Sequence, residues 1–218
     1  MFFPYKDDNP RILVPFVTYG IIAANVLIFL YQFTLAMTGP ESETRFIYMF
    51  GLIPAQFHII NLFTSMFLHG GIAHILGNMW FLWIFGDNVE SALGHARYAL
   101  FYILCGLAAG LAQVMFNIDS ILPMVGASGA IAGVLGAYLI RYPHAQVHVF
   151  VFIFIFFTTI KVPAMIVLGI WFLTQLTNGL GTLGLDTTGG VAWFAHIGGF
   201  IAGVGFNYVF QQIKFKEY

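Results

Sequence analysis

Six long apolar runs follow one another along the chain, and nothing outside them is long enough to build a soluble domain. They cover residues 12–37, 70–88, 96–116, 128–142, 162–180 and 191–211. A helix that crosses a bilayer needs about 20 mainly apolar residues. Only 8% of this chain is charged, against about 25% in soluble domains. We therefore expect an all-α polytopic membrane protein in which six transmembrane helices form a single domain over residues 1–218.

The basic residues predict the orientation of this bundle. With six spans, only Arg45 falls on one side, and the other Lys and Arg residues all fall on the opposite side: Lys6, Arg11, Arg97, Arg141, Lys161, Lys214 and Lys216. The side rich in Lys and Arg normally faces the cytoplasm. We therefore expect both termini to be cytoplasmic. The acidic start of the chain does not suit a cleavable signal peptide, and the plasma (inner) membrane of a prokaryote is the expected location.

A serine and a histidine lie within these apolar runs. Ser128 opens the fourth run in the string Gly-Ala-Ser-Gly, and His196 is near the fifth residue of the sixth run. In the expected topology both residues are in the outer third of the bilayer, His196 about 7 Å below the surface at 1.5 Å per residue. His74 and Asn78 open the second run at the same depth. Polar groups inside a membrane are expensive, so their convergence indicates a functional site toward the extracytoplasmic side.

The fourth run is too short to cross the membrane from Ser128. It would form about 21 Å of helix, whereas the hydrocarbon core is about 30 Å thick. A run that ends at the inner surface must therefore start below the outer one. The preceding residues 121–125 are apolar and interrupted by a proline, which suits a non-helical descent. Irregular backbone at that depth is tolerated when it lines a water cavity, and hydrolysis needs such a cavity.

Glycine spacing predicts how the serine and the histidine meet. Gly129 and Gly133 follow Ser128, and Gly199 and Gly203 follow His196. Small residues four positions apart let two membrane helices pack backbone to backbone. We expect the fourth and sixth runs to pack in this way and to bring the two side chains within hydrogen-bond distance.

The expected chemistry is nucleophilic attack on a peptide carbonyl. Neutral His196 would accept the proton of Ser128, whose alkoxide attacks. The oxyanion would be stabilised by the backbone N–H of Ser128, the Asn78 amide and an N–H of His74. Asp119 and Asp186 lie in outer loops, so we expect a two-residue dyad without a carboxylate.

At these residues the chain resembles the rhomboid intramembrane serine proteases, from about Phe67 to Gly203. Three separated motifs carry the resemblance: HGGIAHILGN at 69–78, GASG at 126–129 and AHIGG at 195–199. The resemblance implies a six-helix rhomboid-like bundle with a Ser128–His196 dyad and with His74 and Asn78 as oxyanion helpers. It also implies an outer loop partly sunk in the outer leaflet at about 38–68, and a gate and cap formed by the fifth run and residues 181–190. The implied substrates are single-pass transmembrane proteins, cut near the outer surface after a small residue.

Two positions depart from the pattern of this family. Many members carry Trp-Arg in the first outer loop, where this chain has Ile60-Asn61. Members often have Tyr or Phe four residues after the serine, stacked on the catalytic histidine, whereas this chain has Ala132. Another side chain must therefore orient His196, or the base is held more loosely.

Two other classes of function remain open. A catalytically inactive rhomboid-like protein would bind membrane clients without cutting them. A transporter or channel would use His74 and His196 as a proton relay or metal site, which leaves the Gly-Ala-Ser-Gly string unexplained. For the protease we expect no cofactor and no metal. The net charge of −1 does not suit nucleic acid, so the expected partners are the lipid bilayer and protein substrates.

The aromatic tract at 150–157 is too short for a seventh span. His148 and Lys161 flank it. We expect it to form an extended or interfacial connection between the fourth and fifth runs.

Overall fold

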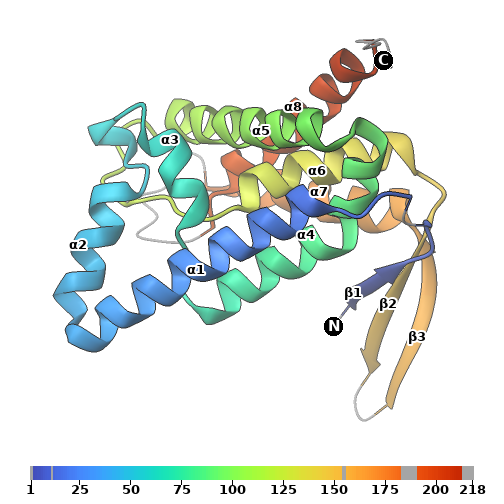
Figure 1. Ribbon diagram of the computed structural model, residues 1–218, viewed down its shortest axis with the longest axis horizontal. Coiled ribbons are helices and arrows are strands. Elements are labelled where there is room, and N and C mark those ends of the chain that lie inside the picture. Colours follow the sequence, from blue (N-terminus) through green and yellow to red (C-terminus); the bar gives the residue numbers. More distant parts are fainter. Residues whose placement is uncertain (1, 11, 154–155, 183–190, 213–218) are drawn as a thin grey trace.

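The protein is mostly helical, as shown by a computed structural model that describes residues 2–10, 12–153, 156–182 and 191–212 (Figure 1). The long helices are α1 (Phe16–Thr38), α4 (Ile72–Leu93), α5 (His95–Phe116), α6 (Ser128–Arg141), α7 (Ala164–Gly181) and α8 (Trp193–Gln212). Between α1 and α4 lie α2 (Pro40–Phe50), α3 (Asn61–Thr64) and two 3₁₀ turns, η1 (Pro54–Gln56) and η2 (Ser65–Phe67). Three strands complete the described chain, β1 (Phe2–Asp7), β2 (Gln146–Ile153) and β3 (Phe156–Pro163).

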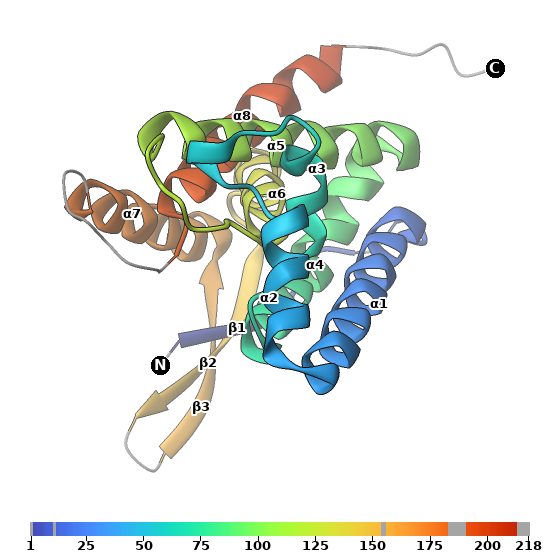
Figure 2. The same ribbon diagram turned by 90° about the vertical axis from the view of Figure 1, so that its left-hand side faces the viewer.

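Helix α6 is the central element of the bundle. Viewed end-on, α4, α5, α7 and α8 surround it, and α1 lies outside α4 (Figure 2). Small residues on α6 allow this close packing, since Ala130, Gly133 and Ala137 are all buried. Ser128 therefore lies at the N-terminus of the most enclosed of the described helices.

By length and composition, four described helices can cross a membrane: α1, α5, α7 and the Trp193–Phe210 part of α8. Helix α6 is apolar but shorter, with 14 residues. The observed helices follow the expected runs, with two shifts at their ends. Helix α4 continues to Leu93, five residues past the expected end, before Gly94 ends it at a φ of +76°.

Helix α1 begins four residues later than expected. Its first N–H groups need acceptors, and the buried Glu90 of α4 supplies them. The Glu90 carboxylate accepts hydrogen bonds from the N–H groups of Val17 and Thr18 at 2.9 and 2.8 Å. This cap comes from a residue more than 70 positions away, so the local sequence did not reveal it.

A three-stranded antiparallel sheet corrects the all-α expectation. The strand order is β1-β2-β3, with Phe3 opposite Phe150 and Gln146 opposite Pro163. Alternating valines and aromatic residues in β2 favour a strand. The 150–157 tract is thus extended, as expected, apart from residues 154–155, which lie outside the described chain. The sheet is joined to α6, because the Tyr138 hydroxyl donates to the Asp7 carboxylate.

The first connecting segment is anchored by an amide where many family members have Trp-Arg. Asn61 is buried, and its Nδ2 donates to the carbonyl oxygens of Gly51 and Met49 at 2.8 and 3.3 Å. Thr64 adds a hydrogen bond to the carbonyl of Phe50 at 2.6 Å. These contacts tie α3 to the end of α2. The departure at Ile60-Asn61 therefore changes the kind of anchor and does not leave the segment unanchored.

Candidate active site

Ser128 is the first residue of α6, and extended chain leads into it. Met124 pairs with Leu52 through two backbone hydrogen bonds of 2.8 and 3.0 Å. The N–H of Gly126 then donates to the carbonyl of Ser65 at 2.9 Å. These bonds fasten the descending chain to the segment before α4. Because Ser128 opens the helix, its own N–H has no acceptor within the helix and remains available to a ligand.

Ser128 and His196 are within hydrogen-bond distance of each other. Ser128 Oγ and His196 Nε2 are 2.8 Å apart. Ser128 is half-buried, and His196 is 9% exposed. The two residues are 68 positions apart in the chain, so only the packing of α6 on α8 brings them together.

The four glycines lie where these two helices touch. A methyl group on Gly199 would overlap the carbonyl oxygen of Gly129, and one on Gly203 would overlap that of Gly133. On its other side, Gly133 packs against the side chain of Cys105 in α5. No side chain fits between the two backbones at these points, so α6 and α8 are held at one separation.

Two polar side chains of α4 face the backbone just ahead of Ser128. Gly126 has a φ of +125°, and a Cβ placed there would lie 2.8 Å from His74 Nε2 and 3.6 Å from Asn78 Nδ2. His74 Nδ1 accepts a hydrogen bond from the N–H of Gly70 at 3.3 Å. The proton of a neutral His74 is therefore on Nε2, the nitrogen that faces Gly126.

Asn78 has a hydrogen-bond donor that is not used within the described part of the chain. This donor is its Nδ2, which is buried. An unpaired buried donor costs about 1–3 kcal/mol, which is a large penalty in a folded protein. Together with His74 Nε2 and the Ser128 N–H, it forms a set of donors suited to a developing negative charge.

Gln175 of α7 contacts His196, and the sequence did not predict it. Its Oε1 lies 2.7 Å from His196 Nδ1. The indole ring of Trp171, one turn earlier, lies with its centroid 5.8 Å from that of the imidazole. The acceptor beside Nδ1 is therefore an amide. Asp119 is exposed in the turn after α5, and Asp186 lies outside the described residues.

A small cavity opens beside the serine. Its volume is about 10 Å³, roughly room for one water molecule. Ser65 and Ser128 contribute to its lining, and most of the remaining wall is glycine and alanine, including Gly106, Ala109 and Ala195.

The long apolar helices define this molecule as a helical membrane protein. The contact of a serine and a histidine where its central helix begins gives it a candidate hydrolytic pair. The chain belongs to the rhomboid family, because the family described as Rhomboid domain matches residues 56–213.

Curated relatives carry the same family name. The chain is 38% identical over 129 residues to "Rhomboid protease GluP" of Bacillus subtilis (strain 168), which covers 57% of this chain and 24% of that protein. It is 31% identical over 163 residues to "RHOMBOID-like protein 6, mitochondrial" of Arabidopsis thaliana, which covers 72% of this chain and 46% of that protein. It is 27% identical over 224 aligned residues to "Rhomboid protein 1, mitochondrial" of Saccharomyces cerevisiae, covering 99% of this chain and 58% of that protein.

The chain thus spans between 24% and 58% of the length of these relatives. Two of the three are named as mitochondrial, so the relatives do not support the expected prokaryotic plasma membrane.

Proposed function

We propose that this protein is an intramembrane serine endopeptidase that hydrolyses a peptide bond in or near the transmembrane segment of single-pass membrane proteins. The observation that carries the proposal is the 2.8 Å contact between Ser128 Oγ and His196 Nε2, next to the unpaired donor of Asn78. A nucleophile, a base and oxyanion donors are the three parts that acyl transfer needs.

In the first half-reaction, His196 Nε2 takes the proton from Ser128 Oγ as this oxygen attacks the substrate carbonyl carbon. The carbonyl oxygen becomes an oxyanion and accepts hydrogen bonds from the Ser128 N–H, Asn78 Nδ2 and His74 Nε2. When the tetrahedral intermediate collapses, the C–N bond breaks and His196 returns the proton to the leaving amine. The products are an acyl ester on Ser128 and a free amine.

In the second half-reaction, water enters where the amine left. His196 Nε2 takes one proton from this water while its oxygen attacks the ester carbon. The same donors stabilise the second oxyanion, and the proton then passes to Ser128 Oγ as the ester bond breaks. The carboxylic acid product leaves and the starting state is restored, so no cofactor takes part in the cycle.

The lining of the cavity supports a preference for small residues at the cut. The space beside Ser128 is small and lined mainly by glycine and alanine. A large side chain on the acyl side of the cleaved bond would meet these walls. Cleavage after a small residue therefore fits this site.

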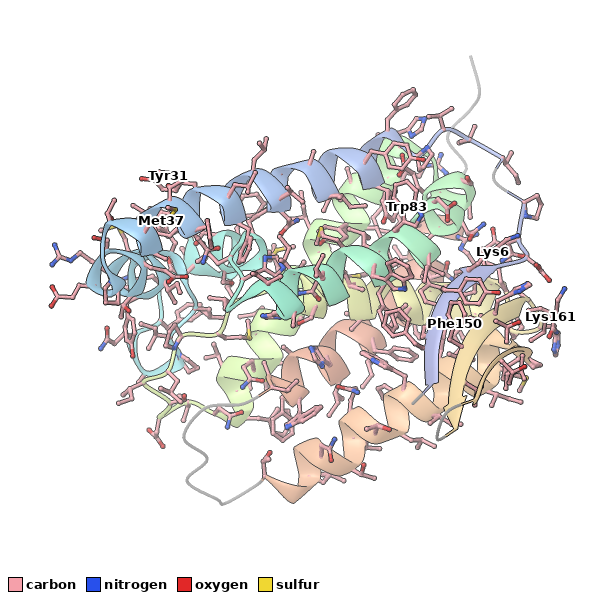
Figure 3. The ribbon with its side chains drawn as sticks, turned by 90° about the horizontal axis from the view of Figure 1, so that it is seen from below. Lys6, Tyr31, Met37, Trp83, Phe150 and Lys161 are labelled. Carbon is pink, nitrogen blue, oxygen red and sulfur yellow. The ribbon has the colours of Figure 1, made fainter. Side chains whose placement is uncertain are left out.

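A six-span topology places the site on the side of the membrane away from the basic residues. Helices α4 and α6 would add two crossings to the four helices that meet the length and composition criteria. Lys6 and Lys161 lie at the sheet end of the molecule, and Met37 lies at the opposite end (Figure 3). Strand β1 is part of the sheet, and the described end of α8 lies at the same end of the molecule (Figure 1). Both observations support termini on the cytoplasmic side.

Cleavage of a reporter with one transmembrane helix, by the purified protein in liposomes, tests this proposal. We expect product from the wild type, and a loss of about 10⁴-fold or more from Ser128→Ala and from His196→Ala. Ser91→Ala and His58→Ala are matched controls outside the site and should cleave normally. Equal cleavage by all variants would reject the dyad. A protein that binds the reporter without cutting it, in the wild type and in Ser128→Ala alike, would be a client-binding relative.

A further inference from the structure

Gln175 is a buried amide with both ends engaged. It is 5% exposed in the middle of α7. Its Nε2 donates to the carbonyl of Trp171 at 3.1 Å, and its Oε1 faces His196 Nδ1 at 2.7 Å. The first contact decides the orientation of the amide, since a carbonyl oxygen can only accept. The oxygen of Gln175 must therefore face the imidazole.

This orientation determines where the proton of His196 sits. An amide oxygen only accepts, so Nδ1 must carry the hydrogen that joins it to Gln175. In a neutral imidazole the other nitrogen, Nε2, then has a free lone pair. That lone pair points at Ser128 Oγ and can accept its proton. The contact chain from Trp171 through Gln175 thus selects the tautomer that a general base needs.

Apart from Ser128, the described side chains that contact the His196 ring through hydrogen bonds or ring packing do not come from α6. The position four residues after Ser128 holds Ala132, which offers no ring to stack on the imidazole. Ring contacts with His196 come instead from Trp171 of α7 and, edge-on, from Trp193 of α8 itself. The hydrogen-bond acceptor of Nδ1, Gln175, and one of the two rings, Trp171, thus belong to α7.

We infer that Gln175 is a positioning residue that holds His196 in its Nδ1–H tautomer, so that the base is fully competent only while α7 is packed against α8. The inference rests on the proposed function and adds a residue to it. When α7 is displaced, Nδ1 loses its acceptor and His196 is free to populate the Nε2–H tautomer, in which the nitrogen facing Ser128 cannot accept a proton. The position of α7 and the activity of the base are therefore coupled.

The tautomer of His196 can be measured without any catalysis. We would label the histidines of the full chain with ¹⁵N, place the protein in bilayers, and identify the His196 signals by their loss in His196→Ala. The expected result is a protonated Nδ1 and an unprotonated Nε2. In Gln175→Leu we expect a mixture of both tautomers. A protonated Nε2 in the wild type, or an unchanged spectrum in Gln175→Leu, would overturn the inference.

Kinetics on the same variants distinguish positioning from simple structural support. For Gln175→Leu we expect kcat to fall about 10- to 100-fold, with little change in KM. The buried Nδ1–H of His196 is then left without an acceptor, and the imidazole is misaligned. Gln175→Glu should retain activity when protonated, since it can then make both contacts of the amide. When the Glu carboxylate ionises, it stabilises the imidazolium. The acidic limb of the kcat–pH profile should therefore move to higher pH.

Gln32→Leu is the matched control. Gln32 is a fully buried glutamine of α1 with two hydrogen bonds to the backbone of His69 and no contact with His196. Its loss should lower thermal stability without altering the tautomer or the kcat–pH profile. If both leucine variants lower kcat equally and leave the profile unchanged, Gln175 is only structural. If the wild type shows the expected tautomer but does not cleave, the proposed function fails while the role of Gln175 in orienting His196 stands.

Discussion

Two helices meet His196, and they are embedded in the molecule to very different extents. Helix α6 has ten of its 14 residues buried and touches α8 backbone to backbone. Helix α7 has four buried residues out of 18 and lies at the edge of the bundle, beside α8 (Figure 2). The distance between Ser128 and His196 is therefore set by the closely packed pair α6 and α8, whereas the inferred orientation of the His196 ring depends on the weakly embedded α7.

This difference separates two properties of the site. Changes between α6 and α8 should alter whether Ser128 and His196 meet at all. Changes between α7 and α8 should alter how well a base that is already in place performs.

Among changes at the helix contacts, the largest effect is expected for Gly199→Val. Its side chain would overlap the carbonyl of Gly129 and push α6 away from α8. Cleavage should fall about 10³-fold or more, because both the alignment of the nucleophile and general-base assistance are lost. Reporter cleavage in liposomes measures this, with thermal unfolding as the test of folding.

Gly205→Val is the control for this change, since it lies on the same helix and a side chain there meets open space. It should cleave normally. A Gly199→Val protein that cleaves at the wild-type rate would show that α6 and α8 need not touch at the glycines.

Asn78→Leu should reduce kcat about 100-fold while the protein becomes no less stable. In the proposed mechanism the amide stabilises charge only in the transition state, and losing one such donor costs about 10²–10³ in rate. In the resting protein its Nδ2 is buried without a described partner, so an apolar side chain removes a penalty. Kinetics and thermal unfolding on the same preparation check both halves of this prediction.

Asn61→Leu should show the opposite pattern. Its Nδ2 donates to the carbonyl oxygens of Gly51 and Met49, so its loss should lower the unfolding temperature. If Asn78→Leu lowered the unfolding temperature as much as Asn61→Leu, this would contradict the view that the Asn78 Nδ2 has no partner in the resting protein.

Gly179→Ala tests the other side of the comparison and should have a smaller effect. A methyl group there would lie 3.1 Å from Ile197 Cδ1 and 3.3 Å from Trp193 Cβ, so the contact between α7 and α8 must loosen by a few tenths of an ångström. We expect kcat to fall about 3- to 10-fold, since the hydrogen bond from His196 to Gln175 weakens but persists. Gly169→Ala, also on α7 and facing open space, should behave as the wild type. An equal loss of kcat in both variants would argue against any role for the packing of α7 against α8.

The smallest effect concerns the sheet that holds the far end of α6. Partial burial, with a smaller contribution from nearby Asp87, raises the pKa of Asp7 to about 6, although the hydrogen bond from Tyr138 opposes the shift. A carboxyl with a pKa above its unfolded value adds stability below pH 4, and this contribution is lost as the pH rises through 6. The wild type should thus lose a few degrees of unfolding temperature, roughly 2–4 °C, between pH 4 and 7. Asp7→Asn should flatten this dependence, and an unchanged slope would contradict the shift.

Most of the helices could be predicted from the sequence because a membrane span must be both long and apolar. The same requirement hid the sheet, because strands of six to eight residues do not reach that length. Their signal was the alternation of valines and aromatic residues in 146–153. The late start of α1 depends on Glu90, a partner that only the folded chain brings near.

Some residues of the candidate site could also be predicted from the sequence, and Gln175 could not. Ser128, His196 and the glycines stand out because a serine, a histidine and regular glycine spacing are conspicuous in apolar runs. Gln175 is an uncharged amide in such a run, without a motif around it. Its importance comes from facing Nδ1 of a histidine on the next helix. A buried amide in a membrane helix usually has a partner, and this was the available signal.

Covalent labelling of Ser128 is the most direct test of the central claim, that His196 activates this serine. A fluorophosphonate should phosphonylate the wild-type protein in liposomes, and mass spectrometry of the digested protein should locate the adduct on Ser128. His196→Ala should remain unlabelled, and Gln175→Leu should be labelled more slowly than the wild type. An adduct on another residue, or labelling of His196→Ala at the wild-type rate, would contradict the account.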